Sequence, residues 1–404
     1  MKQKLVVIGG GAAGFFTAIT AAETNPSLEV IILEKGTKVL QKVKISGGGR
    51  CNVTHACFTP NELIEFYPRG KKELLGPFHQ FMTGDTMEWF EKRGVELKIE
   101  ADNRIFPISN SSQTIINCLM HSAEEAGVTL TLNQNVESIS KIKNQYKINT
   151  STDEFMADKL VIATGSSPKF WKLLTTFKHT IIPPVPSLFT FKINDPRIKE
   201  IPGVSVANAT VKISNSTYES SGPLLVTHWG ISGPAVLKLS AFGARFLAEK
   251  DYQYNVEVNW LSRPTNKVLE HLKALKKEHQ KKQVSLKSIF QEIPKRLWEQ
   301  LVFASEINAT QRWADLSNKQ LEKLANQLTK SEFNANGKTT FKEEFVTAGG
   351  IDLKEVNFKR FESRLHQNLF FAGEVLNIDA VTGGFNFQNA WTGGYIAGKA
   401  IAED

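Results

Sequence analysis

The sequence predicts an α/β protein whose parallel-sheet domain is interrupted by an all-β insert domain and a small helical domain. Three observations lead to this prediction. A strand, a glycine-rich loop, a helix and a second strand open the chain, and segments of the same style return near Thr347 and close it. Between them the pattern changes to short alternating strands and then to polar helices. Because β-α-β units build parallel sheets, the first and last parts of the chain are expected to form one domain.

The opening unit consists of an apolar strand at residues 4–8, a small-residue helix at 12–23 and a second apolar strand at 28–33. Short apolar runs of this kind are typical of strands buried on both faces of a parallel sheet. The same reading predicts helices at residues 82–93 and 111–126, and strands at 95–100, 104–108, 128–132, 136–142, 146–150, 154–158 and 159–163. The strands at 95–100 and 104–108 flank a short polar turn and are expected to pair.

Domain boundaries follow from changes in composition, and Pro183, Pro184 and Pro186 mark the first of them. The expected parts are residues 1–187 for the first part of the sheet domain, 188–262 for the β-rich insert, 263–331 for the small basic helical domain, and 332–404 for the return, in which about 345–404 completes the sheet domain.

Composition narrows the class of protein. Hydrophobic residues make up 41% of the chain and charged residues 22%, which is typical of a soluble globular protein. No apolar run reaches the length of a membrane span, and the N-terminus enters a strand directly, unlike a secretory signal. The cysteines Cys51, Cys57 and Cys118 are too few and too irregularly spaced for a disulfide framework or a zinc site. We therefore expect a cytoplasmic protein with no metal and no membrane anchor.

The net charge of +8 is concentrated in one segment. Residues 263–330 hold 14 Lys and Arg against 7 Asp and Glu, whereas the rest of the chain holds 35 against 34. Such segregation is what an electrostatic footprint for a polyanion looks like, although solvated helical faces are also often basic. The sequence therefore leaves two readings of 263–330, an RNA contact and an ordinary helical surface.

The glycine-rich loop carries the first functional signal. Residues Gly9 to Gly14 fit the pattern G-x-G-x-x-G, follow a strand, open a helix, and precede Glu34 at the end of the next strand. This context is that of a Rossmann-like dinucleotide site. Gly9 permits the tight turn, Gly11 lets the backbone reach a pyrophosphate, and Gly14 allows close packing of helix on strand. Glu34 can accept hydrogen bonds from ribose hydroxyls.

The C-terminal segment favours FAD over NAD. Gly373 and Glu374 follow an apolar strand, and Gly383 and Gly384 then open a long helix. In many flavoproteins an acidic residue at such a position holds the ribityl chain, and the helix N-terminus faces the flavin pyrimidine edge, where negative charge develops on reduction. A strand and helix that only close the sheet would be the alternative.

The motifs "VVIGGGAAG", "ISGGGRCNVT", "RIFPIS", "THWGISGPAVLKLS", "TAGGI" and "FFAGEVLNIDAVTGGFNFQNAWTGGYIAG" occur in order along the chain. With them the sequence resembles the BaiN/YhiN-like family of FAD-dependent oxidoreductases over essentially its whole length. The resemblance implies a glutathione-reductase-like FAD domain with a β insert and a small helical domain. It also implies tightly bound FAD.

The resemblance further implies which residues contact FAD. Gly9, Gly11 and Gly14 are expected at the pyrophosphate, Glu34 at the adenosine ribose, and the Val136 backbone at the adenine. The ribityl and isoalloxazine end is expected at Gly373, Glu374, Asn386, Phe387 and Gln388, with Lys42 and Arg50 along the cofactor. Further FAD contacts are expected from Ala13, Lys35, Gly49, Cys51, Asn52, Thr164, Gly165 and Gly384.

Members of this family carry out different reactions, so three functions stay open. The first is reduction of a C=C bond, with uridine in ribosomal RNA as the substrate. The second is oxidation or reduction of a small molecule, either an amine or aminoketone or an unsaturated ring. The third is a non-catalytic protein that FAD stabilises and that binds RNA or another partner. The expected state is a monomer or weak oligomer.

The electron donor is also open. The sequence contains no second G-x-G-x-x-G, because "WGISGPAVL" has the wrong spacing and no acidic partner downstream. NAD(P)H is therefore expected to bind only transiently, if it is the donor. The absence of a Cys-x-x-Cys pair argues against a disulfide reductase.

Three residues are candidates for catalysis beside the flavin. Cys51 could act as an acid, Arg104 could hold an anionic substrate, and His228 could transfer a proton. Their structural alternatives are a buried packing residue, a surface salt bridge and a structural histidine. His55 is a weaker candidate of the same kind.

Overall fold

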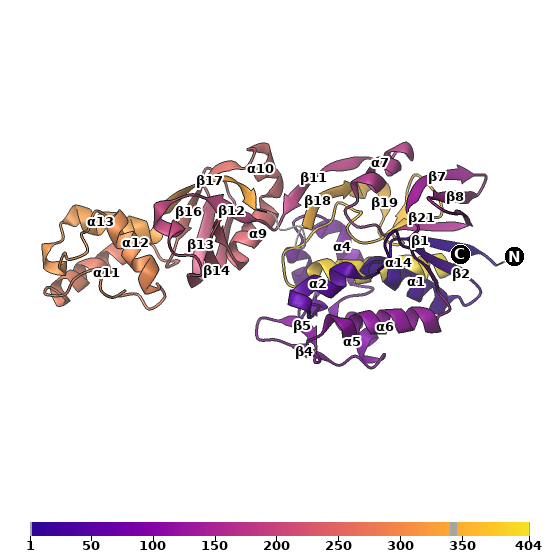
Figure 1. The fold of residues 1–404 in the computed structure, drawn as a ribbon, viewed down its shortest axis with the longest axis horizontal. Helices are drawn as coiled ribbons and strands as arrows, with labels where there is room; N and C mark the ends of the chain where they lie inside the picture. The colour runs from indigo at the N-terminus through magenta and orange to yellow at the C-terminus, as the bar shows by residue number, and fades with distance from the viewer. Residues whose placement is uncertain (1, 340–345, 404) are drawn as a thin grey trace. The chain divides into compact units, whose positions relative to one another are not determined.

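The computed structural model describes residues 2–339 and 346–403 (Figure 1). The chain forms two compact units, Met1–Pro184 together with Val346–Asp404, and Val185–Phe345. The first and last parts of the sequence thus share one unit, as the α/β prediction requires.

The first unit is organised around one sheet with the strand order β19-β20-β21-β10-β1-β2-β6. Strands β21, β10, β1, β2 and β6 run parallel, whereas β20 pairs antiparallel with β21 and β19 pairs antiparallel with β20. Buried aliphatic side chains fill this sheet, as the apolar runs predict. The strands span Lys4–Ile8 (β1), Glu29–Leu33 (β2), Thr129–Thr131 (β6), Lys159–Ile162 (β10), Val356–Asn357 (β19), Glu362–Ser363 (β20) and Leu369–Phe371 (β21).

Two long helices, α1 (Ala12–Thr24) and α14 (Phe385–Glu403), pack tightly against each other. The contact depends on glycines of α14, because a Cβ on Gly398 would lie 2.7 Å from the Thr20 Cβ and one on Gly394 would lie 3.0 Å from the Ala13 carbonyl oxygen. Glycine therefore brings the first and last helices of this unit together, which places the two predicted ligand loops in one region.

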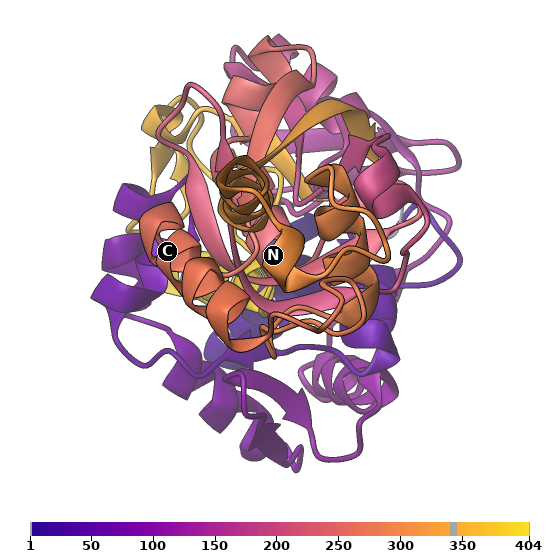
Figure 2. The same ribbon diagram turned by 90° about the vertical axis from the view of Figure 1, so that its left-hand side faces the viewer.

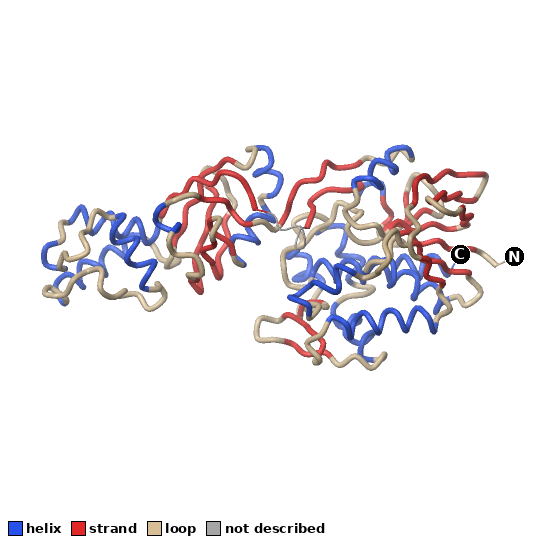
Figure 3. The backbone as a smooth tube through the Cα atoms, in the orientation of Figure 1, coloured by secondary structure: helices blue, strands red, loops and turns tan. Residues whose placement is uncertain are grey.

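Further helices and strands complete this unit, and Figure 3 draws helices in blue and strands in red. The predicted pair at 95–100 and 104–108 is confirmed as two antiparallel strands, and β3 joins them. The elements are α2 (Gln41–Gly49), β3 (Thr54–His55), α3 (Pro60–Leu63), η1 (Ile64–Phe66), α4 (Lys71–Phe78), α5 (Thr83–Glu91), β4 (Leu97–Ile99), β5 (Arg104–Pro107), α6 (Ser112–Glu125), β7 (Val136–Ile142), β8 (Gln145–Thr150), β9 (Glu154–Ala157), α7 (Pro168–Thr176), β11 (Ile181–Ser187), β18 (Val346–Ile351) and η3 (Leu353–Glu355).

The second unit is a closed barrel with helices, in the strand order β12-β15-β14-β13-β16-β17. Buried side chains of the barrel and of α11 to α13 form one continuous hydrophobic cluster, so barrel and helices share a core. In Figure 2 the helices α11 to α13 of this unit are drawn in salmon and orange. Its elements are β12 (Thr190–Ile193), α8 (Pro196–Lys199), β13 (Ser205–Ile213), β14 (Glu219–Thr227), β15 (Gly230–Ser232), α9 (Pro234–Phe242), α10 (Ala244–Glu249), β16 (Gln253–Asn259), α11 (Thr265–Glu278), α12 (Lys295–Ala304), η2 (Trp313–Asp315), α13 (Asn318–Thr329) and β17 (Ser331–Thr339).

None of the helices in the described residues combines the length and the apolar character needed to cross a membrane. Nor do these residues contain a cluster of His, Cys, Asp and Glu side chains that could hold a metal ion.

Candidate functional site

The candidate site lies at the carboxyl edge of the parallel sheet. Strands β2, β1, β10 and β21 are neighbours and run in one direction, so their carboxyl ends meet at one edge. The segments that leave this edge are the Gly9–Gly14 loop, Glu34, Thr164–Gly165 and Gly373–Glu374. The strands that follow β1 in the sequence lie first on one side of it (β2) and later on the other (β10). In doubly wound sheets, ligands bind in the crevice at the point where the strand order reverses in this way.

The Gly9–Gly14 loop is closely packed and leaves a helix N-terminus available. Gly9 has φ +113°, and a Cβ there would lie 2.4 Å from the Ala163 carbonyl oxygen. A Cβ on Gly14 would lie 2.0 Å from the Gly9 carbonyl oxygen, whereas Gly11 has open space at this position. Helix α1 begins at Ala12 with no side-chain cap and no acidic residue in its first turn. Its first N–H groups can therefore bind an anion such as a pyrophosphate.

Glu34 is held at the end of β2 by two backbone bonds. Its Oε2 accepts a hydrogen bond from the Gly10 N–H and its Oε1 one from the Gly36 N–H, each at 2.9 Å. The carboxylate is half-buried, and each oxygen has a further lone pair for a donor such as a hydroxyl. Lys35 beside it is exposed.

The segment that leads to Val136 is held against the end of β2. The Gln134 N–H donates to the Glu34 carbonyl oxygen at 2.8 Å, so the segment that leads into β7 runs alongside the end of β2. Val136 itself is buried and pairs with Thr150 of β8.

Glu374, at the end of β21, forms an ion pair with Lys42 of α2. Lys42 is well exposed, whereas only 17% of the Glu374 side chain is exposed. A Cβ on Gly165 would lie 3.7 Å from Glu374 Oε2, and one on Gly373 would lie 3.1 Å from the Ala13 Cβ. Four segments distant in sequence thus converge around one carboxylate.

Thr164 provides a further sign of a ligand at this edge. Its hydroxyl oxygen is buried and has no hydrogen-bond partner among the described residues. An unsatisfied buried hydroxyl costs about 1–3 kcal/mol, and a polar ligand in the crevice would remove that cost. Together with the open α1 N-terminus and the fixed Glu34 carboxylate, the residues present fit a dinucleotide such as FAD.

The glycine run of "GGGRCN" lies at the end of α2, where the backbone of Ser46, Gly47 and Gly48 leaves the helical conformation. Gly47, Gly48 and Gly49 all have positive φ, and Gly48 and Gly49 have open space where a Cβ would lie. Arg50 is held by the protein, because its Nη1 bonds to Glu100 Oε1 at 2.7 Å, its Nε donates to the Gly47 carbonyl oxygen at 3.4 Å, and its guanidinium carbon lies 3.9 Å from the centre of the Phe106 ring.

Cys51 and Asn52 both point into the protein. Cys51 is fully buried, and burial raises the pKa of its thiol to about 12, so the thiol stays protonated. The buried Asn52 amide, with its nitrogen and oxygen assigned so that both bonds form, bridges the Thr54 carbonyl oxygen and the Gly384 N–H at 2.9 Å each. Asn52 therefore ties the first glycine run to the second.

The Gly383–Gly384 loop packs directly on strand β3. Gly384 has φ +94°, and a Cβ there would lie 2.6 Å from the Thr54 carbonyl oxygen. Gly383 has φ +131°, and a Cβ there would lie 3.4 Å from Cδ2 of His55. Only glycine allows this close approach at both positions.

The side chains that follow in α14 are bonded within the protein. Asn386 both accepts from the N–H and donates to the carbonyl oxygen of Ala380. The fully buried Gln388 accepts from the Thr54 and Thr86 hydroxyls at 2.6 and 3.0 Å, and Phe387 stacks on Trp391. A ligand at this end would therefore meet backbone rather than these polar side chains.

His55 is brought to the site more directly than the sequence indicates. Its ring stacks on Phe385 at 4.6 Å between centroids, and its Nδ1 is buried with no partner in the described part of the chain. Burial lowers the pKa of His55, and the Asp102 carboxylate partly opposes this shift. The sequence offered little sign of this placement. The strand that carries His55 has only two residues, and the strand with which it pairs follows about fifty residues later.

Arg104 lies opposite His55 in the β3–β5 pair, and directly opposite residues project to the same face. Its Nε bonds to Asp102 Oδ2 at 2.7 Å, and its side chain is 37% exposed. His55, Asp102 and Arg104 therefore form one polar cluster, and His55 is its member beside the Gly383–Gly384 loop.

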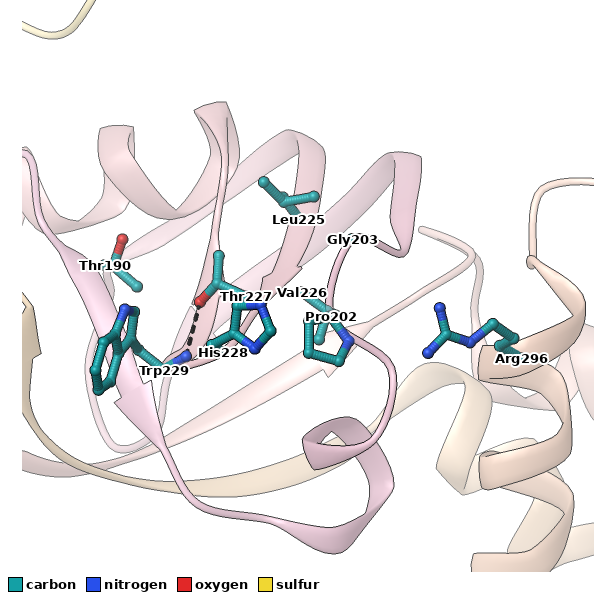
Figure 4. A pocket seen from close by; sticks show the side chains of 9 residues that line it. All are labelled: Thr190, Pro202, Gly203, Leu225, Val226, Thr227, His228, Trp229 and Arg296. Atoms are coloured by element: carbon teal, nitrogen blue, oxygen red, sulfur yellow. Dashed lines mark hydrogen bonds between the residues drawn. The ribbon is translucent and has the colours of Figure 1, made fainter.

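His228 belongs to the second unit, whereas Cys51 and Arg104 belong to the first. It lies in the turn between β14 and β15 and lines a cavity within that unit, together with the neighbouring Trp229 (Figure 4).

Sequence comparison finds relatives that match nearly the whole chain. The profile of the HI0933-like protein Rossmann domain matches residues 3–400. The chain is 29% identical to "Ribosomal RNA dihydrouridine synthase" of Escherichia coli (strain K12), covering 99% of this chain and 97% of that protein. It is 28% identical to "3-dehydro-bile acid delta(4,6)-reductase" of Clostridium scindens, covering 99% of each.

Solved structures share the fold at low identity. A 3-ketosteroid-delta4-(5alpha)-dehydrogenase from Rhodococcus jostii RHA1, in complex with 4-androstene-3,17-dione, aligns with a TM-score of 0.54 and 11% identity over 100% of this chain and 97% of that chain. E. coli quinol fumarate reductase FrdA aligns with a TM-score of 0.50 and 13% identity, over 99% and 70% respectively. The fold is therefore one that redox enzymes use.

Proposed function

The chain belongs to the HI0933-like family and is an FAD-dependent oxidoreductase, and we propose that it reduces a C=C bond of uridine in ribosomal RNA. The convergence of four ligand-type segments at the carboxyl edge of one parallel sheet carries the flavin part of this proposal. The names of the E. coli and Haemophilus influenzae relatives, 29% and 28% identical, support the substrate.

In this proposal the residues at the sheet edge hold FAD. The α1 N-terminus behind Gly11 would bind the pyrophosphate, and Glu34 would accept from the adenosine ribose. Thr164 and Glu374 would face the ribityl chain. Lys42 would either leave its ion pair with Glu374 or keep it and also contact the cofactor. The backbone of the Gly383–Gly384 loop and of the first turn of α14 would meet the flavin ring.

Saturation of a C=C bond needs a hydride on one carbon and a proton on the other. Bound FAD supplies the hydride when it is reduced. This chain must hold the pyrimidine in place, exclude water and deliver the proton.

We assign proton delivery to His55. Its ring borders the Gly383–Gly384 loop, and Nδ1 has no competing partner among the described residues. Asp102 supports the protonated form electrostatically. Cys51 is the other candidate, but its thiol is fully buried and would need a local rearrangement to reach a substrate.

NAD(P)H remains the proposed electron donor, bound transiently. The sequence has no second glycine fingerprint for a dinucleotide, and the described part of the second unit is a barrel with helices. Anaerobic mixing of the FAD-loaded protein with NADPH or NADH tests this, because bleaching of the flavin absorbance is expected with one of them. If dithionite and light also leave the flavin oxidised, FAD would be structural and no redox enzyme would remain.

Reduction of a small unsaturated ring is the second candidate function. The Clostridium scindens relative, named as a bile acid reductase, is as similar as the others and equally complete in coverage. Turnover of a free ring enone by the reduced protein, unaffected by added RNA, would favour this candidate.

The decisive experiment measures dihydrouridine in ribosomal RNA. Nucleoside mass spectrometry is applied to RNA from cells with the protein, cells without it, and cells complemented with wild type or His55→Gln. Loss of one dihydrouridine without the protein and its return with wild type are expected. Unchanged dihydrouridine in cells without the protein contradicts the proposal.

A further inference from the structure

The second unit contains a cavity that the proposed flavin chemistry does not use. Its volume is about 670 Å³, within the range of roughly 300–1,000 Å³ typical of small-ligand pockets. Figure 4 shows Trp229 and His228 from the β14–β15 turn on one side and Arg296 of α12 on the other. The lining residues are Thr190, Pro202, Gly203, Leu225, Val226, Thr227, His228, Trp229 and Arg296.

Trp229 is an unusual tryptophan in this protein. All seven tryptophans lie in the described part of the chain, and six are buried, whereas Trp229 is 52% exposed. Its indole N–H has no hydrogen-bond partner and its ring no aromatic neighbour among the described residues. A large aromatic face exposed in a cavity is typical of a binding site.

The backbone that carries Trp229 is fixed. Thr227 and Gly230 pair across the two-residue turn, and the Trp229 N–H donates to the Thr227 hydroxyl at 3.3 Å. On the other side, the Ile193 N–H donates to the Trp229 carbonyl oxygen at 2.9 Å. The barrel therefore holds the Trp229 backbone at a defined place, so that only the side-chain torsions would lose freedom when a flat ligand stacks on the indole.

Arg296 supplies an uncompensated positive charge. Its Nη2 donates to the Glu200 carbonyl oxygen at 2.7 Å, which holds the exposed guanidinium at the cavity. No carboxylate lines the cavity, and Arg296 has no ion pair within the described residues. The unit as a whole is basic, since residues 185–345 hold 23 Lys and Arg against 16 Asp and Glu.

We propose that this cavity binds one unpaired nucleotide of an RNA, with the base stacked on Trp229 and the phosphate on Arg296. His228 lies between them and can donate a hydrogen bond to either part. A flat apolar face with an unpaired guanidinium fits a nucleotide, and stacking on an aromatic ring requires a base that is not in a duplex. The choice of RNA as the source of the nucleotide rests on the proposed function.

A binding experiment on the full-length, FAD-loaded protein tests the proposal. The probe is a short 5′-phosphorylated oligouridylate, used single-stranded and annealed to its complement, and followed by fluorescence anisotropy. Wild type is expected to bind the single strand more tightly than the duplex. Trp229→Ala should weaken single-strand binding by roughly 5- to 100-fold, the range expected for one lost base stack, and Trp229→Phe should restore most of it.

Matched controls separate the cavity from general surface effects. Phe303 is 73% exposed and does not line the cavity, so Phe303→Ala should leave binding unchanged. Lys295 precedes Arg296 on α12 without lining the cavity, so Arg296→Gln should weaken binding more than Lys295→Gln. Equal effects within either pair overturn the proposal, as does equal binding of single strand and duplex by wild type.

Failure of this inference and failure of the proposed function have different signatures. If dihydrouridine depends on the protein while Trp229→Ala binds like wild type, the cavity assignment is wrong and the proposed function stands. If Trp229→Ala loses binding while ribosomal dihydrouridine does not depend on the protein, the cavity binds nucleotides and the proposed function is wrong. Retained FAD and an unchanged melting temperature show that each variant is folded.

Discussion

The polar side chains of the candidate site differ in whether the protein itself provides them with hydrogen-bond partners. Gln388 and Asn386 have partners within the chain, whereas the Thr164 hydroxyl and Nδ1 of His55 have none among the described residues. Each unsatisfied buried group costs about 1–3 kcal/mol, so a ligand that bonds to Thr164 or His55 would recover that cost.

His55 makes activity depend on pH in a defined direction. Burial lowers its pKa below the usual 6.5, so the protonated acid is lost as pH rises through that lowered value. Re-oxidation of the reduced flavin by substrate should therefore be fastest at low pH and fall as pH increases. His55→Gln should slow the reaction by about 10²- to 10⁴-fold and remove this pH dependence. Stopped-flow absorbance between about pH 5 and 8 measures both.

The matched control is His121→Gln, because His121 is 70% exposed on α6. An unchanged pH profile in His55→Gln would show that another group delivers the proton.

Glu34 should contribute to FAD affinity as well as to the stability of the loops that it holds. Glu34→Ala removes an acceptor for ribose and frees the Gly10 and Gly36 N–H groups, and hydrogen bonds to charged groups are worth about 1.5–3 kcal/mol each. The FAD dissociation constant, measured by calorimetry on the apoprotein, should rise by roughly 10- to 100-fold. Glu29→Ala removes a carboxylate whose exposed ion pair with Lys4 contributes little, and FAD affinity equal in the two variants would contradict the assignment.

At the scale of elements, glycines decide which segments can touch. Gly394 and Gly398 let α14 approach α1, and Gly383 and Gly384 let the start of α14 rest on β3. Asn52 then connects that loop to the segment after α2. The two glycine motifs are therefore parts of one structure, which is why both belong to one candidate site.

Gly384→Ala should damage this arrangement severely. A methyl group there would lie 2.6 Å from the backbone of Thr54, at a φ of +94° that disfavours L-residues. Strain of this kind costs about 1–3 kcal/mol before the clash is counted. We expect a lower melting temperature in calorimetry and loss of FAD on gel filtration.

Gly84→Ala is the matched control for that substitution. Gly84 lies in α5 with open space where a Cβ would lie, so alanine should stabilise the protein by about 0.4–1 kcal/mol. Equal melting temperatures for Gly384→Ala and wild type would show that the loop can move away from β3.

At the scale of the whole molecule, chemistry and charge belong to different units. The flavin-type segments lie in residues 1–184 and 346–404, which have a net charge of +1, and the second unit, 185–345, has a net charge of +7. This division fits a protein in which one unit carries the cofactor and the other meets a polyanion.

RNA binding should therefore depend on salt through the second unit. Lys281 and Lys287 are exposed in the segment between α11 and α12, and Lys281→Gln with Lys287→Gln should lower the slope of log K against log salt by about 1.4. Anisotropy titrations over a range of KCl concentrations measure this slope. The double variant Lys72→Gln and Lys172→Gln, at exposed positions of the first unit, should leave it unchanged. A slope changed by the Lys72 and Lys172 substitutions but not by those at Lys281 and Lys287 would place the RNA contact on the first unit.

The sequence by itself determined the α/β fold and the interruption by a second unit, and it singled out the glycine loops as candidate ligand loops. These features depend on local patterns, because apolar runs predict buried strands and a glycine loop between strand and helix predicts a phosphate site. The strands at 95–100 and 104–108 could be paired because a short turn joins them.

Only the tertiary structure decided which of the candidate side chains are buried within the protein and which lie together. Cys51 and Gln388 are buried within the protein, His55 joins the Gly383–Gly384 loop, and His228 lies with Trp229 in a cavity of the other unit. Each of these outcomes depends on contacts between segments tens to hundreds of residues apart. Local periodicity holds no information about such contacts, because they are set by how helices and strands pack once the chain has folded.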